Sequence, residues 1–303
     1  MKEERLEILR MIREGVVTVE EGERLLRALE EGEDKEKSKT GKKSGFSVFF
    51  NETLGDMFSS LGGMIKSTVE AAVGSTVVID SDMERMDITD NRFALPEGAA
   101  LKVVIKSKGD LHVGASQDGD CLLMDPVPED VKLYGKEGEF VLLCKSGDLH
   151  LAVPVHLERF SLITYGGNIA VREVPVRLKA KTMGGDIVLT KPAKPFSVKT
   201  MGGNMELRLD QPMAEDCKAL TMGGNILLAV KPDIRFVLSA KTMGGTIDID
   251  EALPAAGQKV QKGVAWEKLH TQFTGDNDPF TLAMKTMGGD IVIKATAARA
   301  DHD

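Results

Sequence analysis

Two groups of residues in this sequence combine types and spacings that could do chemistry. Asp186 and Asp290 each follow Thr-Met-Gly-Gly, and two carboxylates that face one cleft could hydrolyse a glycosidic bond. Asn168, Asn204 and Asn225 stand at the same place in other copies of the motif. Because Asp and Asn exchange freely there, the position favours a hydrogen-bonding role in a turn over catalysis. The motif also lacks the Lys-Ser or Lys-Thr pair of a phosphate-binding loop.

The second group is a pair of histidines in similar surroundings. His112 and His150 each stand two residues after an Asp, in the stretches KGDLHV and SGDLHL. On adjacent coils of a repeat protein, the two imidazoles could stack and bind a metal. Their separation of 38 residues suggests a coil between them, so we expect two exposed strand histidines and no metal site.

Composition excludes several classes of protein. The chain has 303 residues and a formal net charge of −8, which argues against a general nucleic-acid binder. Its three cysteines are far apart and lack CxxC spacing, so neither a disulfide framework nor a zinc site is indicated, and no cofactor is expected. The N-terminus has no apolar signal-peptide core, and no stretch reaches the roughly 18 apolar residues needed to cross a bilayer. We therefore expect a cytoplasmic protein.

The elements that position these residues come from an internal repeat. Near-copies of KTMGGDIVL recur, and the first glycines of successive Gly-Gly pairs are separated by steps of 18, 18, 21, 21 and 44 residues. A period of about 20 residues is typical of a solenoid. The marker glycines are Gly166, Gly184, Gly202, Gly223, Gly244 and Gly288.

Each repeat unit reads as two short strands joined by a corner. Apolar residues alternate with others on both sides of Gly-Gly, as expected when one face of each strand is buried. The glycines suit a corner with positive φ or with close approach of the neighbouring coil, and the Thr before them predicts an inner ladder of hydroxyls. The sequence thus predicts a mainly β fold, a right-handed parallel β-helix or β-solenoid of roughly ten coils over residues 75–296.

Two rows at the corner are candidates for an interaction stripe. If Thr points inward, its neighbours form a lysine row and an apolar row on the outside. Repeated lysines could guide an anionic polymer or a headgroup surface, although a solvated edge also explains them. The apolar row is a contact surface if it faces out and core if the corner tucks it in. The stripe comprises Lys181, Lys199, Lys241, Lys285, Tyr165, Met183, Met201, Met222, Met243 and Met287, and Trp266 is a candidate loop contact in an insertion between repeats.

The residues before the repeats predict helices. Residues 1–32 form a helical hairpin with a capping box at Thr18 and Glu21, which is too small to be stable alone and therefore suits self-association or docking. Residues 33–46 are a charged linker and 297–303 a tail. Residues 47–74 form an amphipathic helix that packs on the main domain, binds a partner or lies in a membrane interface. Its apolar face comprises Phe50, Leu54, Met57, Phe58, Leu61, Ile65 and Val69.

These motifs carry a family resemblance. TMGGDIVL repeated at this spacing resembles the bacterial putative-adhesin β-solenoid family, also called the toastrack domain, and residues 1–32 are similar to the SHOCT-like helical module. The resemblance implies a link to cell-envelope stress and membrane-associated complexes without enzymatic activity.

We therefore expect a non-enzymatic binding or scaffold protein. Its expected partners are another protein, a second copy of the chain, or the inner face of the membrane through 47–74, and no nucleic acid is expected. Two alternatives stay open: a carbohydrate-active enzyme built on a β-helix, and a structural protein that forms filaments through the solenoid ends.

Overall fold

The computed structural model describes residues 82–106, 109–116, 121–124, 131–253, 255–262 and 267–296, without the side chains of Cys121, Leu123 and 255–262. The chain divides into two compact units, Met1–Asp82 and Met83–Asp303. The expected helical hairpin, linker, amphipathic helix with its apolar face, Trp266 and tail all lie outside the described residues. Within the described ranges there is no helix, and hence none that could span a membrane.

The described residues form a mainly β unit with two large sheets. Sheet A has twelve strands, in the spatial order β1 (Glu84–Met86), β6 (Lys132–Lys136), β7 (Glu139–Cys144), β3 (Ala100–Ile105), β9 (Arg159–Thr164), β11 (Arg177–Thr182), β13 (Phe196–Lys199), β15 (Cys217–Leu220), β21 (Phe280–Lys285), β17 (Phe236–Thr242), β20 (Glu267–Phe273) and β19 (Ala255–Lys262). Sheet B has ten, in the order β18 (Ile247–Ile249), β22 (Ile291–Ala295), β16 (Ile226–Val230), β14 (Met205–Leu209), β12 (Ile187–Thr190), β10 (Ile169–Arg172), β4 (Leu111–Ala115), β8 (Leu149–Val153), β5 (Cys121–Met124) and β2 (Arg92–Ala94).

Coils stack along these sheets. In each coil a strand of sheet A turns into a strand of sheet B, and parallel pairing joins neighbouring coils. The described chain contains eight such coils where the sequence predicted roughly ten. The prediction was too high because β1, β2, β5, β6, β19 and β20 are antiparallel strands that extend the ends of the sheets.

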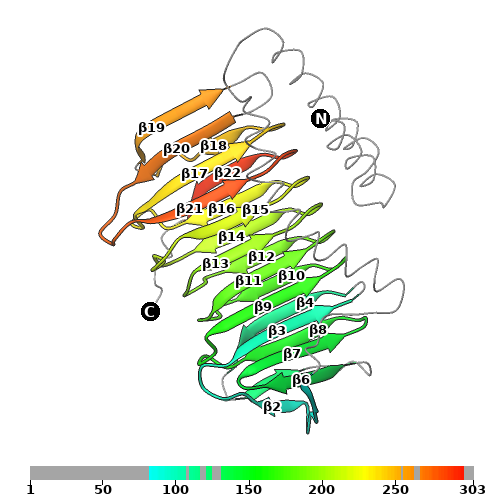
Figure 1. Cartoon of the computed structure of the whole chain (residues 1–303). Coiled ribbons are helices and arrows are strands. Elements are labelled where there is room, and N and C mark those ends of the chain that lie inside the picture. Colours follow the sequence, from blue (N-terminus) through cyan, green and yellow to red (C-terminus); the bar gives the residue numbers. More distant parts are fainter. Residues whose placement is uncertain are drawn as a thin grey trace, which may run out of the picture. The chain divides into compact units, whose positions relative to one another are not determined.

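The order of the coils in space differs from their order in the sequence. Coil β7–β8 lies outside coil β3–β4, which pairs with β9–β10 on its other side. At the other end, coil β21–β22 lies between β15–β16 and the earlier coil β17–β18. Figure 1 shows both exchanges, because cyan β3 and β4 lie among green strands and red β21 and β22 lie among yellow ones.

The core fills the space between the two sheets. Side chains alternate between buried and accessible along strands such as β17, as one buried face requires. The inward rows are almost wholly Leu, Ile, Val, Phe and Ala, and each large side chain contributes about 1.5–3 kcal/mol when fully buried. Near the C-terminal end, the ring of Phe236 stacks on Phe273 and Phe280, with centroids 4.5 and 5.8 Å away. This core holds both sheets, and hence both outer faces, in fixed register.

Candidate functional site

The threonines of the repeat tie each corner to the coil beside it. The hydroxyl of Thr221 donates to the carbonyl oxygen of Gly203 at 2.9 Å and accepts from the N–H of Gly224 at 3.2 Å. The same pair of bonds recurs at Thr164, Thr182, Thr200, Thr242 and Thr286, all of them buried. The expected inner hydroxyl ladder is confirmed, and it satisfies backbone groups that would otherwise be buried without a partner.

The second glycine of each pair is required by close approach. A β-carbon on Gly203 would lie less than 3.0 Å from the backbone of Gly185 in the next coil, whereas one on Gly202 would meet only ordinary contacts of 3.7 Å or more. Among the described residues, the glycines with positive φ are Gly98, Gly138 and Gly147, which are outside the Gly-Gly pairs. Close approach is therefore the correct explanation for the second glycine, and neither explanation accounts for Gly202.

The Asp and Asn residues after the glycines form a third ladder. The side-chain oxygen of Asn204 accepts the N–H of Asn225 at 2.9 Å, and that of Asp186 accepts the N–H of Asn204 at 2.7 Å. In spatial order the ladder runs through Asp148, Asp110, Asn168, Asp186, Asn204, Asn225, Asp290 and Thr246. These side chains join one coil to the next, which explains why Asp and Asn can exchange.

The predicted lysine row lies on the outer face of sheet A. Lys181 is paired in register with Lys199, and Lys285 with Lys241, while Leu220 separates the two pairs. Lys268 of β20 extends the row beyond Lys241. Lys268 was not predicted from the sequence, because β20 is antiparallel and carries no copy of the motif. The only signal for this strand in the sequence is the alternation of residue types over 267–273.

The row belongs to a larger surface, the cationic face. We define it by the outward positions of β3, β9, β11, β13, β15, β21, β17 and β20, which carry ten cationic side chains and no carboxylate. The ten are Lys102, Arg159, Arg177, Lys179, Lys181, Lys199, Lys218, Lys241, Lys268 and Lys285. Carboxylates occur at its margin, where Glu215 forms a bidentate pair with Arg177 and Glu158 lies 3.8 Å from Arg159.

Repulsion within the cationic face is visible at Lys181. Its half-buried ammonium group loses hydration, and Lys199, Lys179 and Lys102 add like charge, so the pKa of Lys181 is lowered. Like charges on directly opposed strand positions are destabilising. The face therefore has an excess of positive charge that an anionic partner would neutralise.

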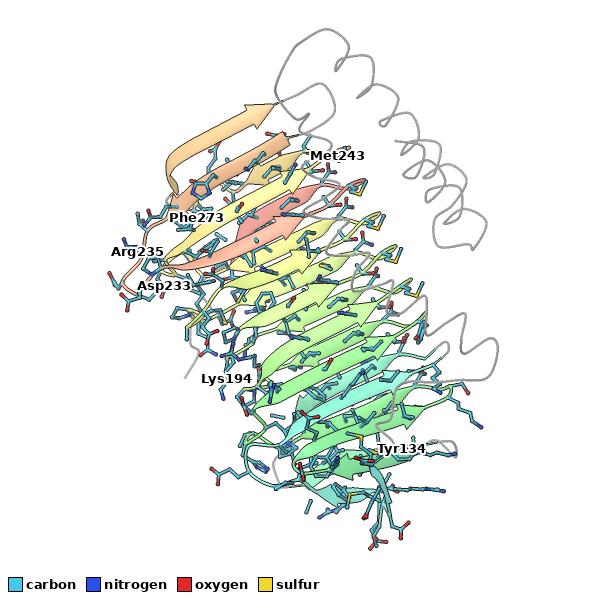
Figure 2. The ribbon with its side chains drawn as sticks, in the orientation of Figure 1. Tyr134, Lys194, Asp233, Arg235, Met243 and Phe273 are labelled. Atoms are coloured by element: carbon cyan, nitrogen blue, oxygen red, sulfur yellow. The ribbon has the colours of Figure 1, made fainter. Side chains whose placement is uncertain are left out.

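The apolar row runs along the corner tips. Met201, Met222 and Met287 are buried, whereas Met183, Met243 and Tyr165 are half-buried. The buried members stand in the middle of the stack and the half-buried ones toward its ends, as expected if each side chain is covered by its neighbours. The buried three are separate from the main core cluster, and Figure 2 shows sulfur atoms along the edge where sheet A turns into sheet B. The row is thus a second, outer ladder that exposes apolar surface chiefly at its ends.

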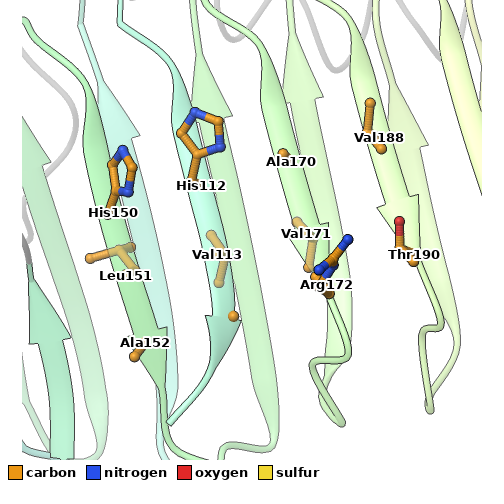
Figure 3. Close-up of a pocket in the computed structure, with 11 residues that line it drawn as sticks. His112, Val113, His150, Leu151, Ala152, Ala170, Val171, Arg172, Val188 and Thr190 are labelled. Carbon is orange, nitrogen blue, oxygen red and sulfur yellow. The ribbon is translucent and has the colours of Figure 1, made fainter.

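The two histidines meet on the outer face of sheet B. β4 and β8 are adjacent and parallel, with His112 in register with His150 and ring centroids 4.7 Å apart. The expected intervening coil is wrong, because β5 and β6 take up the residues between the two coils as antiparallel strands. Beside the rings lies an open depression of about 620 Å³ over Gly114, Ala152 and Ala170, with Arg172 at its other side (Figure 3). No group of three or more His, Cys, Asp or Glu residues suited to a metal occurs within the described ranges.

Comparison with known proteins identifies the N-terminal module. Residues 3–34 match the model of the SHOCT-like domain family, in agreement with the sequence resemblance. No curated protein matches the chain. Two solved structures are similar over 71% of the chain. One is a "putative cell adhesion protein" from Clostridium sporogenes, with 11% identity, a TM-score of 0.36 and 100% of its own chain covered. The other is a "putative adhesin" from Bacteroides fragilis, with 11% identity, a TM-score of 0.29 and 98% covered.

Proposed function

We propose that this chain is a non-enzymatic binding protein, built as a right-handed β-solenoid, whose cationic face binds an anionic membrane surface. One observation carries the proposal: ten cations and no carboxylate occupy the outward positions of eight strands in a chain whose net charge is −8. A random distribution of charge in an acidic protein would place carboxylates among them.

The arrangement suits a bilayer surface because the cations are spread over a broad sheet. Neighbouring strands are about 4.8 Å apart, so the lysines form a two-dimensional array in place of a narrow groove. Each Lys or Arg near an anionic leaflet contributes about 1 kcal/mol to binding. Negative headgroups would also offset the repulsion from Lys199, Lys179 and Lys102, which, after burial, lowers the pKa of Lys181.

Support for a non-enzymatic role comes from the acidic residues. Asp186 and Asp290, the candidates for glycoside hydrolysis, direct side-chain oxygens at backbone N–H groups of the neighbouring coil. They lie in one ladder with Asn168, Asn204 and Asn225, whose amides serve the same purpose. A link to cell-envelope complexes, and a membrane contact through 47–74, stay predictions.

Sedimentation with lipid vesicles tests the proposal on the full chain. We expect binding to phosphatidylglycerol vesicles, weakening as salt rises, and none to phosphatidylcholine vesicles. Replacing Lys179, Lys181 and Lys199 by Glu should weaken binding by at least about 100-fold, since three contacts of about 1 kcal/mol are lost.

A matched control places the same change of charge on the outer face of sheet B. Arg172, Arg208 and Lys294 lie at outward positions there, and replacing them by Glu should leave most of the binding intact. Equal loss in the two triple variants would show that only net charge matters and would contradict the proposal. Binding to a soluble polyanion without binding to vesicles would also contradict it, in favour of an anionic polymer.

A further inference from the structure

We propose that His112 and His150 form a binding site for a divalent transition-metal ion on the outer face of sheet B. The site is independent of the cationic face, since the two lie on different sheets. It depends on the direct parallel pairing of β4 with β8, which brings two residues 38 positions apart into register.

The geometry of the pair suits bidentate capture of one ion. The two rings project from adjacent parallel strands, with centroids 4.7 Å apart and planes inclined by 41°. Both side chains are exposed, so each ring can turn about its χ angles without disturbing the core. A metal–nitrogen bond of about 2.0–2.1 Å requires only that one nitrogen of each ring turn toward a point between them. Figure 3 shows the two rings side by side above the depression.

Gly114 gives a second, independent indication of a site. It lies two residues after His112 and forms part of the floor of the depression. A β-carbon there would meet nothing within 4 Å, and its φ is not positive, so neither packing nor backbone conformation requires glycine. What glycine does at this position is keep the space beside the imidazoles open. That space leaves room for the ion and for water at its remaining coordination positions.

The donor set defines the class of metal. Two neutral imidazoles favour ions such as Zn²⁺, Ni²⁺ and Cu²⁺, whereas Mg²⁺ and Ca²⁺ prefer oxygen ligands. Two protein ligands make an open site, because a closed structural zinc site needs four. The alternative is that the rings only stack on each other, which would give no preference for any metal.

Calorimetric titration of the full chain with Zn²⁺ and Ni²⁺, and with Mg²⁺ for comparison, tests the site. His112→Gln and His150→Gln each remove one ligand while keeping a polar side chain, and His270→Gln on β20 of sheet A serves as the matched control. Loss of groups that merely support a ligand costs about 10- to 100-fold in metal affinity, so loss of a ligand itself should weaken Zn²⁺ binding at least tenfold. The control should bind as the unchanged chain does.

Proton NMR with Ni²⁺ distinguishes metal binding by the two histidines from a purely structural role of these side chains. The chain has five histidines, and substoichiometric Ni²⁺ should broaden the imidazole signals of His112 and His150 before the others. Circular dichroism confirms that each variant is folded. The proposal would be overturned if the variant that carries both His112→Gln and His150→Gln bound Zn²⁺ as tightly as the unchanged chain. Uniform broadening of all five imidazole signals would overturn it as well.

Discussion

Gly203 faces the backbone of Gly185 across adjacent coils so closely that a β-carbon on Gly203 would lie within 3.0 Å of the Gly185 carbonyl group. Next to it, Gly202 has room for a β-carbon. Close approach therefore requires only the second of the two glycines in this motif.

Substituting the two glycines separately should show this difference. We expect Gly203→Ala to lower the free energy of unfolding by about 1–3 kcal/mol or more, because the backbone of the next coil must move. Gly202→Ala should change it by less than about 0.5 kcal/mol, as exposed substitutions usually do. Urea unfolding followed by circular dichroism measures both. Equal losses in the two variants would show that close approach is not the reason for the second glycine.

The hydroxyl group of a corner threonine should contribute more to the stability of the fold than the volume of the side chain does. Thr221→Val keeps the volume but leaves the carbonyl of Gly203 and the N–H of Gly224 without their buried partner. Each buried unsatisfied group costs about 1–3 kcal/mol, so thermal unfolding should begin several degrees lower. Thr190→Val, at an outward position of β12, is the control and should have little effect. A stable Thr221→Val variant would refute the role of the ladder.

Removing a charge from the cationic face should stabilise the fold. The pKa of Lys181 is lowered by burial first and by Lys199, Lys179 and Lys102 next. At neutral pH the charged form is therefore disfavoured in the folded state, and Lys181→Met should raise the free energy of unfolding by a few tenths to about 1 kcal/mol. The gain should shrink as the pH rises through the lowered pKa of Lys181 and be gone above the ordinary lysine pKa, where the group is neutral in both states.

The same substitution should weaken binding to anionic vesicles. Lys191→Met is the comparison, because Lys191 contacts Glu173 at 2.8 Å and lies outside the cationic face. That variant should show neither the gain in stability nor the loss of binding. A loss of stability in Lys181→Met would mean that packing of its methylene groups outweighs the repulsion.

Burial should protect the thiol of Cys217 and make stability depend on alkaline pH. Burial raises the pKa of Cys217 from 9.0 to about 11. Because the folded pKa is the higher one, this contribution to stability is complete below pH 9 and is lost as the pH rises toward 11. Between pH 8 and 10.5 the unchanged chain should lose more stability in urea than Cys217→Ala does. Parallel losses would contradict the shift.

Much of the corner could be predicted because its causes are local. Thr, Gly-Gly and Asx recur at fixed spacing, and alternation marks the strands on either side. The sequence could not decide which glycine property mattered, since positive φ and close approach select the same residue. The partner of Asp186 was also hidden, because the side chain bonds to the next coil in place of its own turn.

Coil order escaped prediction because near-identical repeats pair equally well with any neighbour. Only small departures from the repeat pattern indicate the order of the coils. Thr246 replaces Asp or Asn in one copy, and that copy lies in the terminal coil of sheet B, where no further coil requires an acceptor. The 44-residue step from Gly244 to Gly288 marks the same place. His112 and His150 were misjudged for a different reason, since their spacing of 38 residues suggested an intervening coil, whereas the antiparallel strands β5 and β6 lie between β4 and β7 in the chain.

The insertion of β21–β22 between β15–β16 and β17–β18 has a consequence for synthesis of the chain on the ribosome. Coils from β9–β10 to β15–β16 can be added one at a time as they emerge, each onto its predecessor. β17 and β18 emerge before the coil that pairs them with the rest of the stack. That end can close only after β22, Ile291–Ala295, has left the exit tunnel. A nascent chain halted before residue 280 therefore lacks the coil that joins β17 and β18 to the rest of the stack, and completion of this end of the stack becomes a single late event.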